Sequence, residues 1–119
     1  MDRRMEFFAS LSVQDDRARL TLRGELDAFT ALLLRWRADD ALALGSRHFV
    51  VDVTDVTFVD AAGLGALVRL HNAAQRLDGS ITLIGADEHF RRACDLAGLT
   101  EVFSMPAPAV HAMEAAGTG

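Results

Sequence analysis

The chain has 119 residues, of which 50% are hydrophobic and 24% charged, and its formal net charge is −5. This length and composition predict one folded domain over residues 1–119, with a short tail from about residue 106, and they exclude a disordered chain. The negative charge and the scattered arginines argue against a direct nucleic-acid partner, because phosphate contacts need clustered cations.

Several missing features narrow the class of protein further. No apolar run approaches the roughly 20 residues that cross a bilayer, and no signal-peptide core follows the N-terminus, so we expect no membrane insertion. The one cysteine, Cys94, permits no internal disulfide, which suits a reducing compartment and predicts a cytoplasmic protein. The sequence contains no lysine and no tyrosine, which removes the P-loop lysine, Schiff-base chemistry and phenolic acid–base groups.

The chain begins with two alternating segments that flank a polar turn at residues 14–17. Their inward positions are Phe7, Ala9, Leu11 and Val13 in the first segment, and Ala18, Leu20 and Leu22 in the second. A period of two on both sides of a short turn predicts a β-hairpin with one face in water.

A helix is predicted next, with Asp27 as its N-cap and Gly45 as its C-terminal stop. Apolar residues recur there at helical spacing, namely Phe29, Leu32, Leu33, Trp36, Ala43 and Leu44. We expect this stripe, Trp36 included, to face the core.

Two short apolar runs, His48–Val53 and Ser80–Ile84, are typical of strands covered on both faces. The helix predicted between them, from Ala61 to about Asp78, carries a stripe of small and apolar residues: Gly63, Leu67, Leu70, Ala74 and Leu77. Strand, helix and strand in this order predict a parallel βαβ unit.

A third helix is expected over Asp87–Ala97, with Phe90 and Cys94 on its buried side. A short edge strand over Thr100–Phe103 and a short helix around Val110 complete the prediction. The fold class is therefore α/β, with a small mixed sheet (an N-terminal hairpin, then parallel strands) and three to four helices packed against it.

The most unusual segment is Val51–Leu67, in which the predicted strand runs into a loop with acidic residues at Asp52, Asp55 and Asp60. Asp60 can cap the helix that begins after it. The first turn of that helix is nearly without side chains, since it reads Ala61, Ala62, Gly63, Leu64 and Gly65. Two glycines cost a helix roughly 1 kcal/mol each, so we expect them to let another molecule approach closely.

Three motifs in this order resemble the STAS family (sulphate transporter and anti-sigma factor antagonist domains), most closely its stand-alone bacterial anti-sigma factor antagonists. Gly24–Asp27 reads Gly-Glu-Leu-Asp, as the family does after its second strand. Asp60–Gly65 matches in position the family's Asp-Ser-Ser-Gly-Leu-Gly, and Asp95–Leu99 is similar to its third-helix ending.

The resemblance implies a non-catalytic module that binds an anti-sigma factor of the serine-kinase type and so releases a sigma factor, without a cofactor or metal. The partner-binding residues that it implies are Asp27, Thr57, Phe58, Asp60, Ala61, Ala62, Gly63 and Leu64. We expect Gly63→Arg to abolish docking without disturbing the fold.

The family's phosphoacceptor serine or threonine, directly after the aspartate, is replaced by Ala61, and Ala62 offers no hydroxyl either. Phosphorylation at this position, which disrupts docking in the family, is therefore not expected. Regulation through Thr54, Thr57 or Cys94 stays open, as does a homo-oligomer.

Other readings remain. The chain could be the soluble STAS subunit of a membrane transport assembly of the ABC type, or a small-ligand sensor using the strand ends. A magnesium site of Asp52, Asp55 and Asp60, as in receiver domains, is disfavoured because receivers also require a lysine. A zinc site is disfavoured because the histidines are dispersed, at positions 48, 71, 89 and 111.

Overall fold

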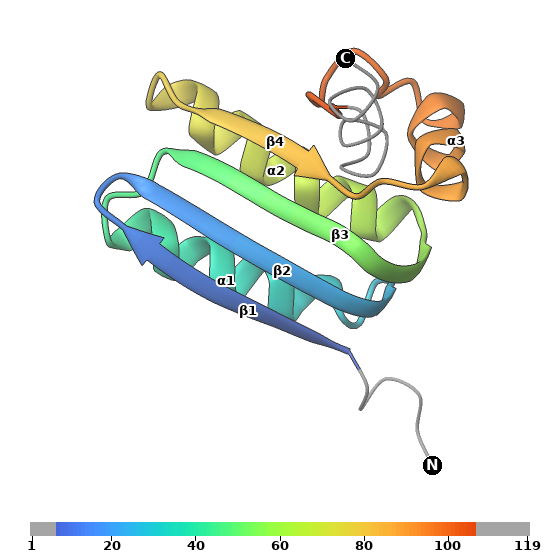
Figure 1. Ribbon diagram of the computed structural model, residues 1–119, viewed down its shortest axis with the longest axis horizontal. Helices are drawn as coiled ribbons and strands as arrows, with labels where there is room; N and C mark the ends of the chain where they lie inside the picture. The colour runs from blue at the N-terminus through green and yellow to red at the C-terminus, as the bar shows by residue number, and fades with distance from the viewer. Residues whose placement is uncertain (1–6, 107–119) are drawn as a thin grey trace, which may run out of the picture.

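The computed structural model describes residues 7–106, which form a four-stranded sheet and three helices (Figure 1). The elements in chain order are β1 (Phe8–Gln14), β2 (Arg17–Leu26), α1 (Ala31–Ala43), β3 (His48–Val59), α2 (Ala61–Arg76), β4 (Ser80–Ile84) and α3 (Glu88–Leu96). The strand order is β1-β2-β3-β4, with β1 antiparallel to β2 and the other neighbours parallel. The predicted mixed α/β fold is confirmed.

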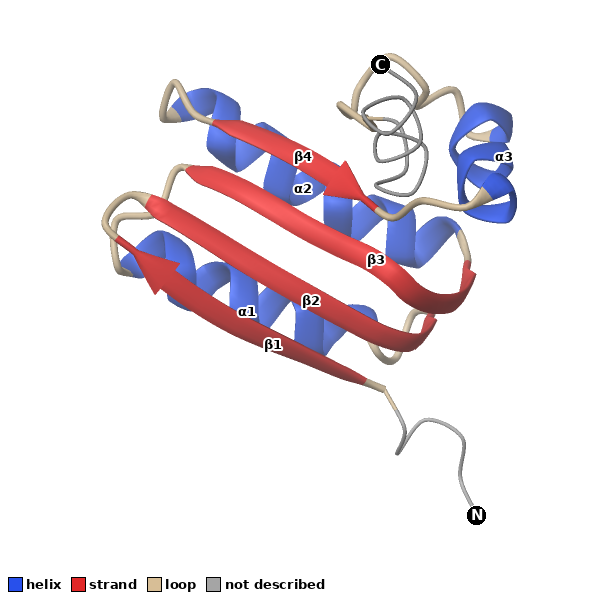
Figure 2. Ribbon diagram, in the orientation of Figure 1, coloured by secondary structure: helices blue, strands red, loops and turns tan. Residues whose placement is uncertain are grey.

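The helices α1 and α2 cover one face of the sheet, and α3 lies beyond the end of β4 (Figure 2). The alternating positions predicted to point inward in β2 do so, since Ala18, Leu20 and Leu22 are at most 3% exposed. They pack with Phe49 and Val51 of β3 in the layer between the sheet and the helices. The hairpin and the buried face of β2 are therefore confirmed. In the first segment Phe7 and Ala9 are buried as predicted, whereas Leu11 is half-buried and Val13 is exposed.

The strand β3 differs from its prediction in length and in burial. It continues beyond Val53 to Val59, because its second half pairs with β2 through two register irregularities. Thr57 and Phe58 therefore lie in a strand and not in a loop. Phe49, Val51 and Val53 are buried, whereas the alternating residues between them are only half-buried. The prediction of a strand covered on both faces was wrong, because helices cover only one face.

The core face of α1 also differs from its prediction. The buried residues are Ala31, Leu34, Ala38 and Ala41. The larger side chains are exposed, with Phe29 at 64%, Leu32 at 44%, Trp36 at 62% and Leu44 at 66%. Both sets have helical spacing, and the small alanines let α1 lie close to the sheet. Trp36 is therefore a surface residue, not a core residue.

The start of α1 is built by two residues in place of the one predicted. The helix begins at Ala31 with Thr30 at the N-cap. The Asp27 carboxylate caps the preceding turn, since it accepts from the N–H groups of Phe29 at 3.0 Å and Thr30 at 2.9 Å.

The second and third helices agree with their predictions to within two residues. In α2 the predicted stripe is buried from Gly63 to Ala74, whereas Leu77 lies after the helix and is 46% exposed. The edge strand predicted at Thr100–Phe103 is a turn, and this segment meets β4 at a single bridge between Thr82 and Ser104. The helix predicted around Val110 lies outside the described residues.

Candidate docking site

The carboxyl ends of the parallel strands meet at one edge of the sheet, where α1 and α2 begin. Leu26 of β2 is paired with Val59 of β3, so the residues that follow them, Asp27 and Asp60, leave the sheet side by side. The N–H of Asp60 donates to the carbonyl of Leu26 at 3.2 Å. Two predicted site residues from distant parts of the sequence are thus brought together by strand pairing.

The carboxylates of three aspartates at this edge accept hydrogen bonds from backbone N–H groups. Asp60 accepts from the N–H of Gly63 at 3.0 Å, which confirms its predicted role as the N-cap of α2. Asp87 accepts from the N–H of Phe90 at 2.8 Å at the start of α3, and Asp27 caps the turn before α1. These carboxylates satisfy helix ends, which is a structural role.

The predicted site residues divide by exposure. Thr57, Phe58, Ala61 and Ala62 are exposed, and Phe58 presents half of its surface to solvent. Asp27 and Asp60 are half-buried, whereas Gly63 and Leu64 are buried. We define the helix-entrance surface as the outward-facing set: Thr57, Phe58, Asp60, Ala61 and Ala62.

Gly63 is required by the packing of the chain itself. A Cβ at this position would lie 2.5 Å from the carbonyl oxygen of Leu26 and 2.8 Å from its Cγ. The expectation that Gly63 leaves room for a partner was therefore wrong, and Gly63→Arg would disrupt the fold. Leu64 is 4% exposed. It belongs to the core, and its side chain is not accessible to a partner.

Gly65 differs from Gly63, since a Cβ built on it would meet no atom within 4 Å. It is exposed on α2. The packing of the described residues gives no reason for a glycine here, although glycine costs a helix about 1 kcal/mol relative to alanine. The open position predicted in this motif is therefore Gly65.

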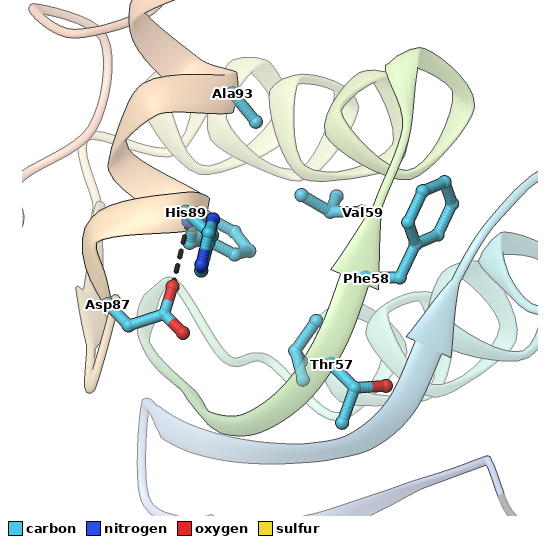
Figure 3. Close-up of a pocket in the computed structure, with 8 residues that line it drawn as sticks. Thr57, Phe58, Val59, Asp87, His89 and Ala93 are labelled. Atoms are coloured by element: carbon cyan, nitrogen blue, oxygen red, sulfur yellow. Dashed lines mark hydrogen bonds between the residues drawn. The ribbon is translucent and has the colours of Figure 1, made fainter.

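A pocket of about 300 Å³ lies between the end of β3 and the start of α3 (Figure 3). Its lining residues are Val56, Thr57, Phe58, Val59, Asp87, His89, Phe90 and Ala93. In Figure 3 the side chain of Val59 points toward α3, and His89 lies on the side of α3 that faces β3, whereas the ring of Phe58 points away. Sequence reasoning placed a possible ligand at the strand ends but missed His89, whose position depends on where α3 packs.

Metal binding finds no support among residues 7–106, where no group of three or more His, Cys, Asp or Glu side chains could hold an ion. Asp52 pairs with Arg19 at 3.1 Å and accepts from the Thr54 hydroxyl at 2.6 Å. His48 contacts the hydroxyl of Ser80, and His71 meets the ring of Phe103 edge-on. Position 111 lies outside the described residues.

Comparisons with known proteins agree with the fold. The STAS domain model matches residues 9–113. An anti-sigma-B factor antagonist of Bacillus subtilis is 26% identical over 88 residues, which cover 74% of this chain and 80% of the relative. An anti-sigma factor antagonist from Mycobacterium paratuberculosis has a similar structure, with a TM-score of 0.75, 22% identity and 92% of each chain covered.

A second similar structure is that of the anti-sigma factor antagonist SpoIIAA in its unphosphorylated form. Its TM-score is 0.73 at 17% identity, and the match covers 94% of this chain and 98% of SpoIIAA. Within residues 7–106, no helix is both long and apolar enough to span a bilayer.

Proposed function

Because the chain belongs to the STAS domain family, we propose that it is an anti-sigma factor antagonist, a non-catalytic protein that docks on an anti-sigma factor through its helix-entrance surface. The observation that carries the proposal is the exposed, nearly bare start of α2, where Ala61 and Ala62 follow closely in the chain after Phe58, which is also exposed. The Bacillus subtilis relative and the similar structure from Mycobacterium paratuberculosis are both anti-sigma factor antagonists, which supports the same role. Such a role belongs in the cytoplasm.

The chemistry of this surface suits docking better than catalysis. Its carboxylate, on Asp60, is occupied as an N-cap, and its remaining side chains are small, apolar or hydroxyl-bearing. Exposed aromatic side chains are enriched in protein interfaces, and the small side chains of Ala61 and Ala62 leave room for a partner to approach.

The start of α2 offers no hydroxyl group for phosphorylation at Ala61 or Ala62. Ala61 follows the capping aspartate directly and has no hydroxyl to accept a phosphate. We propose that the partner is an anti-sigma factor of the serine-kinase type and that its kinase activity does not release this chain. Docking would then be constitutive, or regulated at another position.

Capture from the native cell tests the docking surface. The wild-type protein, immobilised and incubated with lysate, should recover an anti-sigma factor. Ala61→Glu should lose it, because the variant places a charge on the helix-entrance surface while favouring the helix dipole. The control is Ala43→Glu, which introduces the same charge at an exposed alanine at the C-terminal end of α1. This variant should recover the partner. Equal recovery by both variants would reject the placement.

Intact mass tests the switch. After incubation with the captured partner and ATP, wild-type protein should gain no phosphate, whereas Ala61→Ser should gain one. A stoichiometric phosphate on the wild-type chain would show that another hydroxyl serves as the acceptor.

A further inference from the structure

The outer side of the two-helix layer carries a groove between α1 and α2. It consists of two hollows, of about 280 and 150 Å³, that share Arg35, Ala66 and Arg69 in their linings. Because the hollows share these residues, they form one continuous depression that begins at Ala62 and reaches Arg76. The helix α1 has 13 residues, so the groove follows about 20 Å of helix at a rise of 1.5 Å per residue.

The floor of the groove is made of small side chains on α2. Gly65 and Ala66 lie there, and Ala73 continues the floor about two helical turns further along α2. A Cβ on Gly65 would meet nothing within 4 Å, so the space above this residue is unfilled by the chain itself. A helix or other backbone of a partner could therefore approach α2 closely at this point.

One wall of the groove is apolar and exposed. Leu32 lines it and is 44% exposed. Trp36, one turn further along α1, is 62% exposed and lies outside the lining of both hollows, next to the groove on the same helix. These are the residues that sequence periodicity assigned to the core. Large apolar side chains at i and i+4 on a solvent-facing helix surface are unfavourable for an isolated domain, and they are the type of anchor found in protein interfaces.

The charge of the groove is opposite to that of the whole chain. Arg35, Arg69 and Arg76 line it with one acidic residue, Asp39, which gives three positive and one negative charge, or +2, against −5 for the chain. Among the ion pairs of residues 7–106, none involves these three arginines. Their charges are thus available to an acidic partner.

We propose that this α1–α2 groove is a second docking surface and that it takes an acidic amphipathic helix of a protein partner. The apolar side of such a helix would cover Leu32 and Trp36 and approach Gly65. Its carboxylates would pair with the three arginines, which gives specificity and a salt-sensitive association rate. The groove meets the helix-entrance surface at Ala62 and extends from there along α1 and α2 to Arg76. The test below uses the full chain without an anti-sigma factor, so the proposal does not depend on what binds the helix-entrance surface.

The test begins with an unbiased probe. Amphipathic helices of 18 residues with a randomised polar face are displayed on phage and selected against the full chain. A selected peptide is then synthesised, and its binding is followed by the emission of Trp36, the one tryptophan in the sequence. We expect the selected sequences to be enriched in Asp and Glu, and the emission to shift to shorter wavelength as the peptide covers the indole.

Two variants locate the peptide in the groove. Gly65→Leu fills the space above α2, and the double variant Arg35→Glu/Arg69→Glu reverses two charges in the lining. Each should weaken the peptide at least tenfold, while Arg92→Glu, an exposed arginine on α3, should leave its affinity within twofold. Circular dichroism checks that the variants keep their helices.

Several outcomes would overturn the proposal. These are a selection that yields no binder, binders without acidic enrichment, or binders that the groove variants bind as well as wild type. A shift of Trp36 emission on anionic lipid vesicles without any selected peptide would assign the groove to a membrane surface. A wild-type dimer in sedimentation velocity that Gly65→Leu dissociates would assign it to a second copy of the chain.

Discussion

The backbone N–H of Asp60 donates to the carbonyl oxygen of Leu26 at 3.2 Å, and the same oxygen lies 2.5 Å from where a Cβ of Gly63 would stand. One backbone atom of β2 thus positions the N-cap of α2 and dictates the glycine three residues later. The two glycines of the motif, Gly63 and Gly65, therefore have different causes. The first is required by the chain's own packing, and the second is not.

This difference predicts opposite effects of the same substitution. Gly63→Ala should lower the free energy of unfolding by about 1–3 kcal/mol, because its methyl group overlaps the Leu26 carbonyl and forces the backbone to shift. Gly65→Ala should raise it by about 1 kcal/mol, because alanine favours the helix and its methyl group meets no neighbour. Urea unfolding followed by circular dichroism measures both. Equal shifts for the two variants would contradict the packing at Leu26.

The sequence was sufficient to predict the elements in which only one set of residues has the apolar spacing of a strand or a helix. In β2 one set of alternating residues is apolar, so Leu20 and Leu22 could be assigned to the core. In α1 two sets have helical spacing, and choosing the larger side chains placed Trp36 inside. The structure buries Leu34 with three alanines, because small residues bring the helix close to the sheet. Side-chain size alone does not decide which set faces inward.

The candidate site shows the same limit. Asp60 could be predicted as a cap because the helix that it caps follows directly in the sequence. The requirement for Gly63 depends on Leu26, which is 37 positions earlier and is brought close only by strand pairing. The extension of β3 to Thr57 and Phe58 depends on the same pairing, and so could not be read from local polarity.

We predict that protonation of Asp52 lowers the stability of the folded chain in acid. Partial burial raises the pKa of its carboxyl group, but hydrogen bonds from the hydroxyl and N–H of Thr54 and the guanidinium of Arg19 outweigh this, and the pKa is lowered overall. A lowered pKa in the folded state means that the carboxylate stabilises the fold above the unfolded value of about 3.9. This contribution is lost as the pH falls through the lower, folded value.

Asp52→Asn should therefore lower the free energy of unfolding at pH 7 by about 1 kcal/mol. The difference from wild type should shrink as the pH is lowered below about 4, where the wild-type carboxylate becomes protonated. Denaturant titrations between pH 2.5 and pH 7 measure this convergence. Asp55→Asn, at an exposed position of the same strand, removes the same charge and controls for net-charge effects. A difference that stays constant across this range would contradict the assignment.

Hydrogen bonds from Arg91 hold the segment that follows α3, up to Pro106. Its guanidinium donates to three backbone carbonyls, those of Ala86 at 3.3 Å, Met105 at 3.2 Å and Pro106 at 3.1 Å. Arg91→Met keeps the length of the side chain but removes these donors. We expect the segment to open more often, at a cost of about 1 kcal/mol or more.

The N–H of Leu83 reports this opening, because it donates to the carbonyl of Ser104 at 2.8 Å. Its hydrogen-exchange protection should fall by about tenfold in Arg91→Met, since 1.4 kcal/mol corresponds to a factor of ten. The neighbouring variant Arg92→Met removes only an exposed contact with Glu88 at 4.0 Å and should leave protection unchanged. Equal protection in both variants would show that Arg91 does not hold the segment.

Cys94 is a buried thiol, and its chemistry should follow from that. Its side chain is fully buried on α3, and burial raises the pKa of the thiol although the nearby charge of Arg91 acts in the opposite direction. The reactive thiolate is therefore scarce and inaccessible in the folded chain. We expect iodoacetamide at pH 7.5 to label Cys94 at least 100-fold more slowly in buffer than in 6 M guanidinium chloride. Intact mass against time measures both rates. Rapid labelling of the folded protein would contradict its burial and would restore Cys94 as a candidate redox switch.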